Sequence, residues 1–141
     1  MSKVLLADDD PFLTQIYSTR LIRDGHQVIC CADGQQALNQ IKEQNPDLIV
    51  LDIMLPKLNG LDILSAVKED KQLAKIPVII LSNLSHKEEQ EEAKSRGATE
   101  FLAKVDYTPN QVIMVLQRYL SKTELKNKET EKPKNNNQKL K

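Results

Sequence analysis

Five short, continuous runs of apolar residues limit most strongly how this chain can fold. Each run has three or four residues, is rich in β-branched side chains and does not alternate with polar residues. This pattern is typical of strands that are buried on both faces of a parallel sheet. The runs are residues 4–7, 28–31, 48–51, 78–81 and 101–103.

A segment that we expect to be helical follows each of these runs, and all but the fourth have a helical spacing of apolar residues. They cover about residues 11–24, 35–43, 60–69, 86–96 and 109–120. Asp10-Pro11 and Thr108-Pro109 each pair a capping residue with a proline at the first helical position, which favours a helix start. The fourth segment has no apolar residue except Ala93, so we expect it to be exposed and mobile. The alternation predicts one doubly wound α/β domain, (βα)₅.

Charge divides the chain into a body and a tail. The 141 residues carry a formal net charge of zero, yet residues 122–141 contain seven lysines and only three glutamates. Apolar periodicity ends near Leu120, so we expect a folded domain over residues 1–121 and a basic, disordered tail or linker over 122–141. No second folded domain is expected in this chain, and therefore no DNA-binding helix-turn-helix.

Hydropathy and cysteine usage indicate a reducing, aqueous compartment. No uncharged apolar stretch approaches the roughly 20 residues that cross a bilayer, so no membrane insertion is expected. Cys30 and Cys31 are the two cysteines and are adjacent, which disfavours a disulfide between them. We predict a cytoplasmic protein with reduced cysteines.

Polar residues that can bind a metal ion or take part in a reaction follow four of the five predicted strands. If the strand order is 2-1-3-4-5, the carboxyl ends of strands 1, 3, 4 and 5 surround one crevice. Repulsion between carboxylates there calls for a proton, a cation or an ammonium group, and oxygen ligands without nearby His or Cys suit Mg²⁺. Loops are polar in any fold, and Asp10 alone is explained by helix capping. The residues concerned are Asp8, Asp9, Asp10, Asp52, Ser82 and Lys104.

The same residues lie in motifs that resemble the receiver domain of bacterial two-component response regulators, and especially stand-alone, chemotaxis-regulator-like members. The motifs are VLLADDDP from Val4, LIVLDIMLPKLNG from Leu48, PVIILSN from Pro77 and FLAK from Phe101. The resemblance implies a flavodoxin-like fold in which Asp52 is the phosphoacceptor. It also implies that Asp8, Asp9, Asp52 and the Met54 carbonyl hold Mg²⁺, that Ser82 and Lys104 stabilise the phosphoryl group, and that Ser82 and Phe101 form the switch.

Several residues depart from the family pattern. Val105 stands where the family usually has a proline joined by a cis bond, so the loop is either strained or rebuilt in trans. Asn83 is larger than the common residue at its position and is expected to narrow access to Asp52. Met54 and Leu84 flank the expected route of hydrolytic water, and their apolar side chains predict slow self-dephosphorylation.

The favoured function is a signalling receiver rather than an enzyme. It would accept a phosphoryl group from a sensor histidine kinase or phosphotransfer protein and then bind a downstream protein or effector, with a phosphorylation-dependent homodimer as one outcome. Two alternatives stay open. One is a non-phosphorylatable binding module on the same fold, and the other is an Mg²⁺-dependent aspartate-nucleophile phosphatase, which typically has an acid where this chain has Met54.

Overall fold

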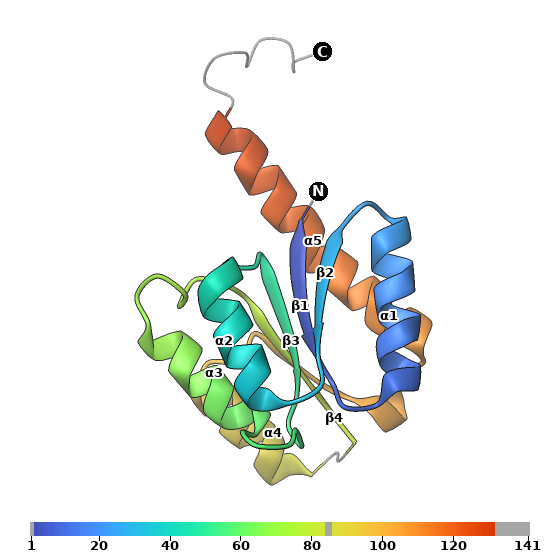
Figure 1. Cartoon of the computed structure of the whole chain (residues 1–141), viewed down its shortest axis with the longest axis vertical. Coiled ribbons are helices and arrows are strands. Elements are labelled where there is room, and N and C mark those ends of the chain that lie inside the picture. Colours follow the sequence, from blue (N-terminus) through green and yellow to red (C-terminus); the bar gives the residue numbers. More distant parts are fainter. Residues whose placement is uncertain (1, 84–85, 132–141) are drawn as a thin grey trace.

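The computed structural model describes residues 2–83 and 86–131 and contains a five-stranded parallel sheet in the order β2-β1-β3-β4-β5 (Figure 1). This order and the (βα)₅ architecture confirm the sequence prediction. The strands are β1 (Lys3–Ala7), β2 (Gln27–Cys31), β3 (Leu48–Asp52), β4 (Val78–Ser82) and β5 (Glu100–Ala103). The helices are α1 (Pro11–Arg23), α2 (Gly34–Gln44), α3 (Gly60–Glu69), α4 (Lys87–Ser95) and α5 (Pro109–Glu131), with a short 3₁₀ helix, η1, at Lys104–Asp106.

Burial along the strands follows their place in the sheet. All residues of the central strands β3 and β4 are buried, as their continuous apolar sequences predict. The edge strand β2 is only partly buried, so burial on both faces was a wrong expectation for this strand. Its Cys30 is exposed and its Cys31 is buried, and both thiols are free.

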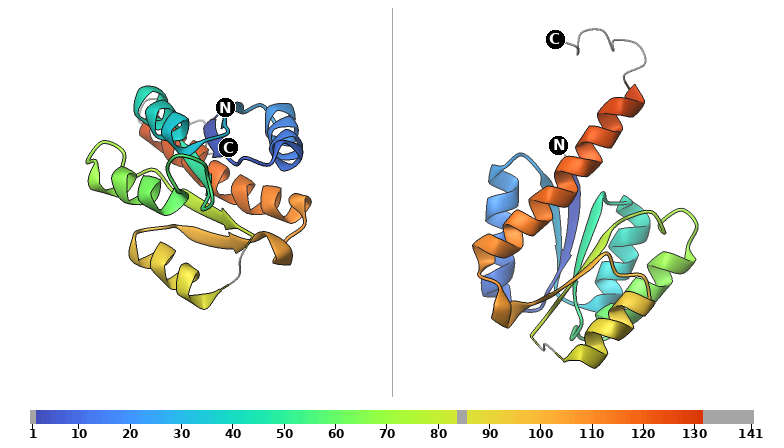
Figure 2. Two further views of the ribbon diagram at one scale, coloured as in Figure 1. Left: turned by 60° about the horizontal axis from the view of Figure 1, so that its bottom comes forward. Right: turned by 180° about the vertical axis from the view of Figure 1, so that it is seen from behind.

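Helices α1 and α5 cover one face of the sheet, and α2, α3 and α4 cover the other (Figure 2). An apolar cluster lies between the sheet and the helices on each face. Alternate residues of β3 point to opposite clusters because successive side chains of a strand leave opposite faces. Ile49 and Leu51 pack with α2, α3 and α4, whereas Leu48 and Val50 pack with α1 and α5. The sheet is thus packed against helices on both faces.

Helix α4 is attached to the domain mainly at its C-terminal end. Ala93 is its buried residue, and the capping residue His86 makes no side-chain cap hydrogen bond. At the other end, the Arg96 guanidinium donates to the Leu61 carbonyl and the Asp62 carboxylate of α3, each at 3.1 Å. The predicted exposure of this helix is confirmed, and its mobility stays a prediction.

Helix α5 is longer than predicted. It runs to Glu131, so the expectation of disorder from residue 122 is wrong for residues 122–131, and residues 132–141 lie outside the described part. Lys and Glu, which are frequent in this stretch, favour helix without an apolar face to mark it in the sequence. Within the described residues, no helix is long and apolar enough to cross a membrane.

Candidate functional site

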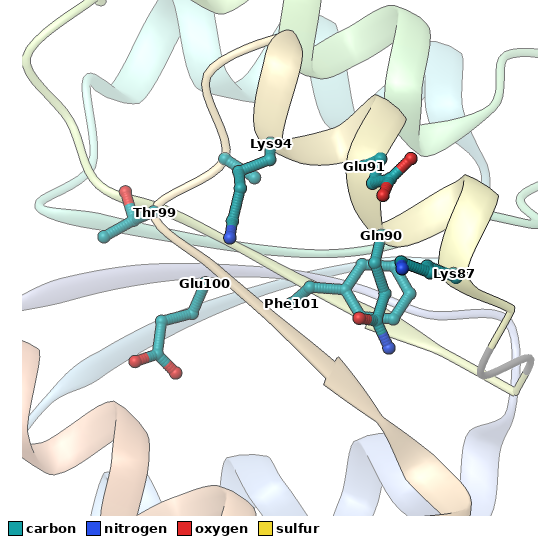
Figure 3. Close-up of a pocket in the computed structure, with 8 residues that line it drawn as sticks. Lys87, Gln90, Glu91, Lys94, Thr99, Glu100 and Phe101 are labelled. Atoms are coloured by element: carbon teal, nitrogen blue, oxygen red, sulfur yellow. The ribbon is translucent and has the colours of Figure 1, made fainter.

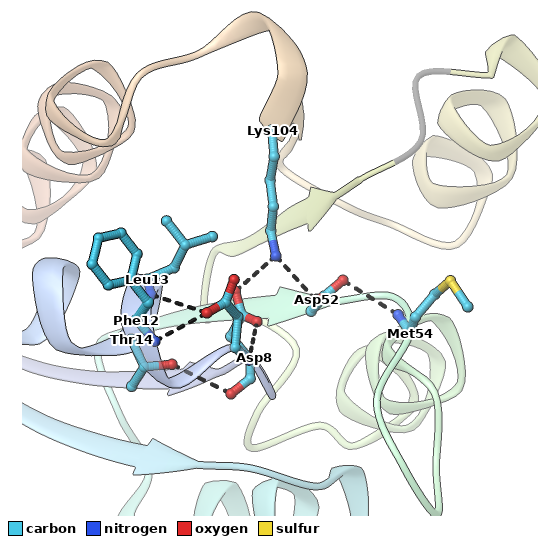
Figure 4. Close-up of polar contacts among 8 residues, drawn as sticks. Asp8, Phe12, Leu13, Thr14, Asp52, Met54 and Lys104 are labelled. Carbon is cyan, nitrogen blue, oxygen red and sulfur yellow. Dashed lines mark hydrogen bonds and ion pairs between the residues drawn. The ribbon is translucent and has the colours of Figure 1, made fainter.

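Side chains from the carboxyl ends of β1, β3 and β5 meet in one ion-pair network (Figure 4). The Lys104 ammonium donates to Asp8 Oδ2 at 2.8 Å and to Asp52 Oδ2 at 3.1 Å. Both carboxylates are buried, and the Lys104 side chain is only 9% exposed. Three of the predicted site residues therefore lie together, as the strand order required.

Backbone groups fix the two buried carboxylates. Asp8 Oδ1 accepts the Asp10 N–H at 3.0 Å, and Asp52 Oδ1 accepts the Met54 N–H at 3.3 Å. The Thr14 hydroxyl donates to the Asp8 carbonyl at 3.3 Å, a contact that sequence reasoning missed. Asp10 accepts from the Phe12 and Leu13 amides and so caps α1, which confirms the structural explanation of this residue.

Burial and neighbouring charges shift the protonation of this network. Burial raises the pKa of Asp52, and the negative charge of Asp8 adds to this effect, although the Lys104 ammonium opposes it. Burial by itself would lower the pKa of Lys104. The hydrogen bond to Asp8 and the charges of both carboxylates outweigh it, so the pKa of Lys104 is raised. Lys104 therefore stays charged, and Asp52 is more basic than an exposed carboxylate.

The donor set fits a hard divalent cation. Carboxylate oxygens of Asp8, Asp9 and Asp52 lie within 4.8 Å of one another, and Asp9 is exposed. When ionised, these three carboxylates carry two negative charges that Lys104 does not compensate. Oxygen ligands of this charge suit Mg²⁺, which keeps several of its waters.

Ser82, Met54 and Asn83 differ in how deeply they are buried. Ser82 is buried at the end of β4, next to the strand end that carries Asp52. Met54, whose N–H donates to Asp52, is 62% exposed, and Asn83, the residue after Ser82, is also exposed. Leu84 lies outside the described residues.

Phe101 lies away from the acidic cluster. Its ring is partly buried and lines a groove of about 420 Å³ between α4 and β5 (Figure 3). Lys87 and Gln90 of α4 lie close to the ring in this view, and Glu100 of β5 and Thr99, which precedes this strand, line the other side. Phe101 therefore lies where α4 meets β5.

The β5–α5 connection reaches the site without the family's proline. No cis peptide bond occurs among the described residues, so the bond before Val105 is trans. Lys104 is the first residue of the short helix η1. The Tyr107 N–H, just after this helix, donates to the Lys104 carbonyl at 3.4 Å. Of the two forms left open by the sequence, the structure has the loop rebuilt in trans.

Two glycines hold the loop that follows Asp52, which a single sequence does not reveal. A Cβ atom at Gly60 would lie 2.2 Å from the Asp52 carbonyl oxygen, and one at Gly34 would lie 1.7 Å from the Leu58 carbonyl oxygen. Gly60 is part of the recognised motif. Nothing in the sequence indicates a role for Gly34, because its contact with Leu58 depends on the path of a loop more than twenty residues away.

Comparisons with known proteins agree with this geometry. The family model described as the response regulator receiver domain matches residues 4–117. The chain is 31% identical over 121 residues to the probable transcriptional regulator ycf27 of Guillardia theta, and it covers 46% of that protein. It is 29% identical over 123 residues to the alkaline phosphatase synthesis transcriptional regulatory protein PhoP of Bacillus subtilis and covers 50% of it. The chain thus spans about half the length of these curated relatives.

Solved structures show the same fold. The Francisella response regulator 1452 receiver domain is 33% identical with a TM-score of 0.77, and the match covers 87% of this chain and 99% of that one. The chemotaxis response regulator CheY4 of Vibrio cholerae is 32% identical with a TM-score of 0.77, with 84% and 98% covered. Taken with the family model, these matches show that the chain belongs to the response regulator receiver family.

Proposed function

We propose that Asp52 accepts a phosphoryl group from a phosphohistidine of a sensor kinase or phosphotransfer protein. The observation that carries the proposal is the Lys104 ammonium bridging Asp8 and Asp52 at the carboxyl ends of three strands. Receiver domains are signalling modules of two-component systems, and a buried, raised-pKa carboxylate beside a fixed cation suits the nucleophile of such a transfer.

In the transfer, a carboxylate oxygen of Asp52 forms a bond to phosphorus while the phosphorus–nitrogen bond of the donor imidazole breaks. The electron pair of the broken bond goes to the imidazole nitrogen. Lys104 lies within hydrogen-bond distance of Asp52 and so can follow the charge that develops on the phosphoryl oxygens. The Met54 N–H orients the carboxylate.

Asp8, Asp9, Asp52 and the Met54 carbonyl are the residues that would hold Mg²⁺. Bound there, Mg²⁺ supplies positive charge that neutralises the phosphoryl oxygens. The uncompensated charge of the three clustered carboxylates supports this assignment.

The output of the switch follows from Ser82 and the groove between α4 and β5. Phosphorylation of Asp52 gives the Ser82 hydroxyl a new acceptor at the end of the neighbouring strand, and this draws the start of the β4–α4 connection toward the site. Phe101 then turns from the groove toward the sheet. The altered face formed by β4, α4 and β5 binds a downstream protein or a second copy of the chain.

Incubation with acetyl phosphate and Mg²⁺, followed by intact-mass measurement, tests the proposal. We expect a mass gain of one phosphoryl group in the wild type, no gain in Asp52→Asn and no gain when Mg²⁺ is chelated. Asp70→Asn, at the end of α3, is the matched control and should behave as the wild type. A gain in Asp52→Asn equal to that of the wild type would contradict the assignment.

The same samples separate the two other functions. Turnover of a phosphomonoester by unphosphorylated wild type would indicate a phosphatase, whereas Met54 offers no proton to a leaving group at the usual place of the second acid. A wild type that stays unphosphorylated with every donor would indicate a binding module. Oligomer size measured before and after phosphorylation reports the homodimer.

A further inference from the structure

The loop between β3 and α3 carries Met54 and is held by the start of α2. The Gly34 N–H donates to the Pro56 carbonyl at 2.9 Å. As the first residue of a helix, Gly34 has no carbonyl partner within α2, so this contact satisfies an amide that the helix leaves free. Lys57 Nζ adds a 3.8 Å ion pair with Asp33, the capping residue of the same helix.

Contact between the two backbones at this point leaves no room for a side chain. A Cβ atom at Gly34 would lie 1.7 Å from the Leu58 carbonyl oxygen and 2.6 Å from its carbon. Both are backbone atoms, so relief requires the loop or the start of α2 to move. Lys57, between the contact residues Pro56 and Leu58, has a φ of 71°, a left-handed conformation that a residue with a side chain rarely adopts. The tight fit at Gly34 helps to hold this loop path.

The loop is too short to absorb such a movement before it reaches the site. Its two ends are joined, because the Gly60 N–H donates to the Ile53 carbonyl at 2.9 Å. The Ile53 N–H donates to the Leu81 carbonyl of β4 at 3.3 Å. Between these anchors lies Met54, whose N–H donates to Asp52. A displacement at residues 56–58 is therefore transmitted to the Met54 peptide.

We propose that Gly34 is a positioning residue for the metal site, because its close contact with Leu58 and Pro56 sets the place of the Met54 carbonyl. This inference rests on the proposed Mg²⁺ site. Groups that orient a metal ligand change metal affinity by about 10–100-fold when altered. We expect Gly34→Ala to weaken Mg²⁺ binding by about tenfold, with a slower rate of phosphorylation at subsaturating Mg²⁺ that recovers as Mg²⁺ is raised.

The variant test measures Mg²⁺ affinity by NMR titration, without any phosphodonor. Gly25→Ala is the matched control, since it places a side chain at a φ of 95° with nothing within 4 Å of the new Cβ. It should lower thermal stability and leave Mg²⁺ affinity unchanged. Equal affinity for Gly34→Ala and wild type, or an equal loss in Gly25→Ala, would overturn the inference. Absence of Mg²⁺ binding in the wild type would instead overturn the proposed function.

A second measurement on the wild type covers the case in which Gly34→Ala does not fold. If the Gly34 contact and the metal site are coupled, Mg²⁺ must slow exchange of the Gly34 amide by reciprocity. Exchange through a local opening that abolishes binding slows about tenfold when Mg²⁺ is about ten times its dissociation constant. The Asn45 amide, at the far end of α2, should not change. Equal slowing of both amides, or no slowing of Gly34, would overturn the inference.

Discussion

Replacing Lys104 by Met tests how the two buried carboxylates are compensated. The ammonium donates to Asp8 and Asp52 at 2.8 and 3.1 Å, and at 9% exposure its contacts are weakly screened by solvent. A hydrogen bond to a charged group contributes roughly 1.5–3 kcal/mol, so two contribute roughly 3–6 kcal/mol. Asp52 can take up a proton when the cation is lost, which limits the effect. We expect Lys104→Met to lower the free energy of unfolding by about 3 kcal/mol near neutral pH.

The assay is urea unfolding of both proteins over a range of pH, with and without Mg²⁺. Because the folded-state pKa of Lys104 is raised, its contribution is complete below the unfolded-state pKa of lysine and is lost as the pH rises through the folded-state value. Mg²⁺ should stabilise the variant more than the wild type, since it supplies the missing charge. Lys57→Met, which removes a 69%-exposed lysine, is the control and should change stability by less than about 1 kcal/mol. A loss in Lys104→Met no larger than in Lys57→Met would refute the reasoning.

Three further predictions concern the acidic cluster, helix α4 and the rim of the site. Burial raises the pKa of Asp52 in the folded state. Protonation of Asp52 therefore stabilises the folded state relative to the unfolded state. This stabilisation is complete below the unfolded-state pKa of Asp52 and is lost as the pH rises through its folded-state pKa. Asp52→Asn should therefore unfold at higher urea concentration than the wild type near neutral pH and at the same concentration in acid; equal stability at neutral pH would contradict this. Arg96→Ala removes the hydrogen bonds from the C-terminal end of α4 to α3 and should speed amide exchange in α4 while leaving β3 unchanged; unchanged α4 exchange would show that other contacts hold the helix. We predict slow loss of the phosphoryl group from the wild type, and polar replacements of Met54 and Leu84 should accelerate it; loss within seconds from the wild type would contradict this prediction.

The sequence predicts most of the fold because its apolar runs are continuous and well separated. Leu48–Leu51 and Val78–Leu81 become the fully buried centre of the sheet, and parallel strand ends bring Asp8, Asp52 and Lys104 together. Placement of these residues needed only the strand order. Their roles in phosphoryl transfer stay predictions.

Other features depend on information that periodicity does not carry. The extension of α5 to Glu131 follows from the helix propensity of Lys and Glu, which leaves no apolar stripe to recognise. The trans connection at Val105 depends on the local path of η1. The contact of Gly34 with Leu58 joins the start of α2 to the loop after β3, so neither segment shows it alone.

The central claim is that Asp52 receives a phosphoryl group and that this alters the face formed by α4 and β5. Amide NMR spectra recorded with and without beryllofluoride and Mg²⁺ test this claim most directly. Beryllofluoride imitates the phosphoryl group without a covalent transfer. We predict large shifts for Met54, Ser82 and Lys104 and, beyond the site, for Gln90 and Phe101, all of which require Mg²⁺ and vanish in Asp52→Asn. Unchanged spectra in the wild type, or the same shifts in Asp52→Asn, would contradict the account.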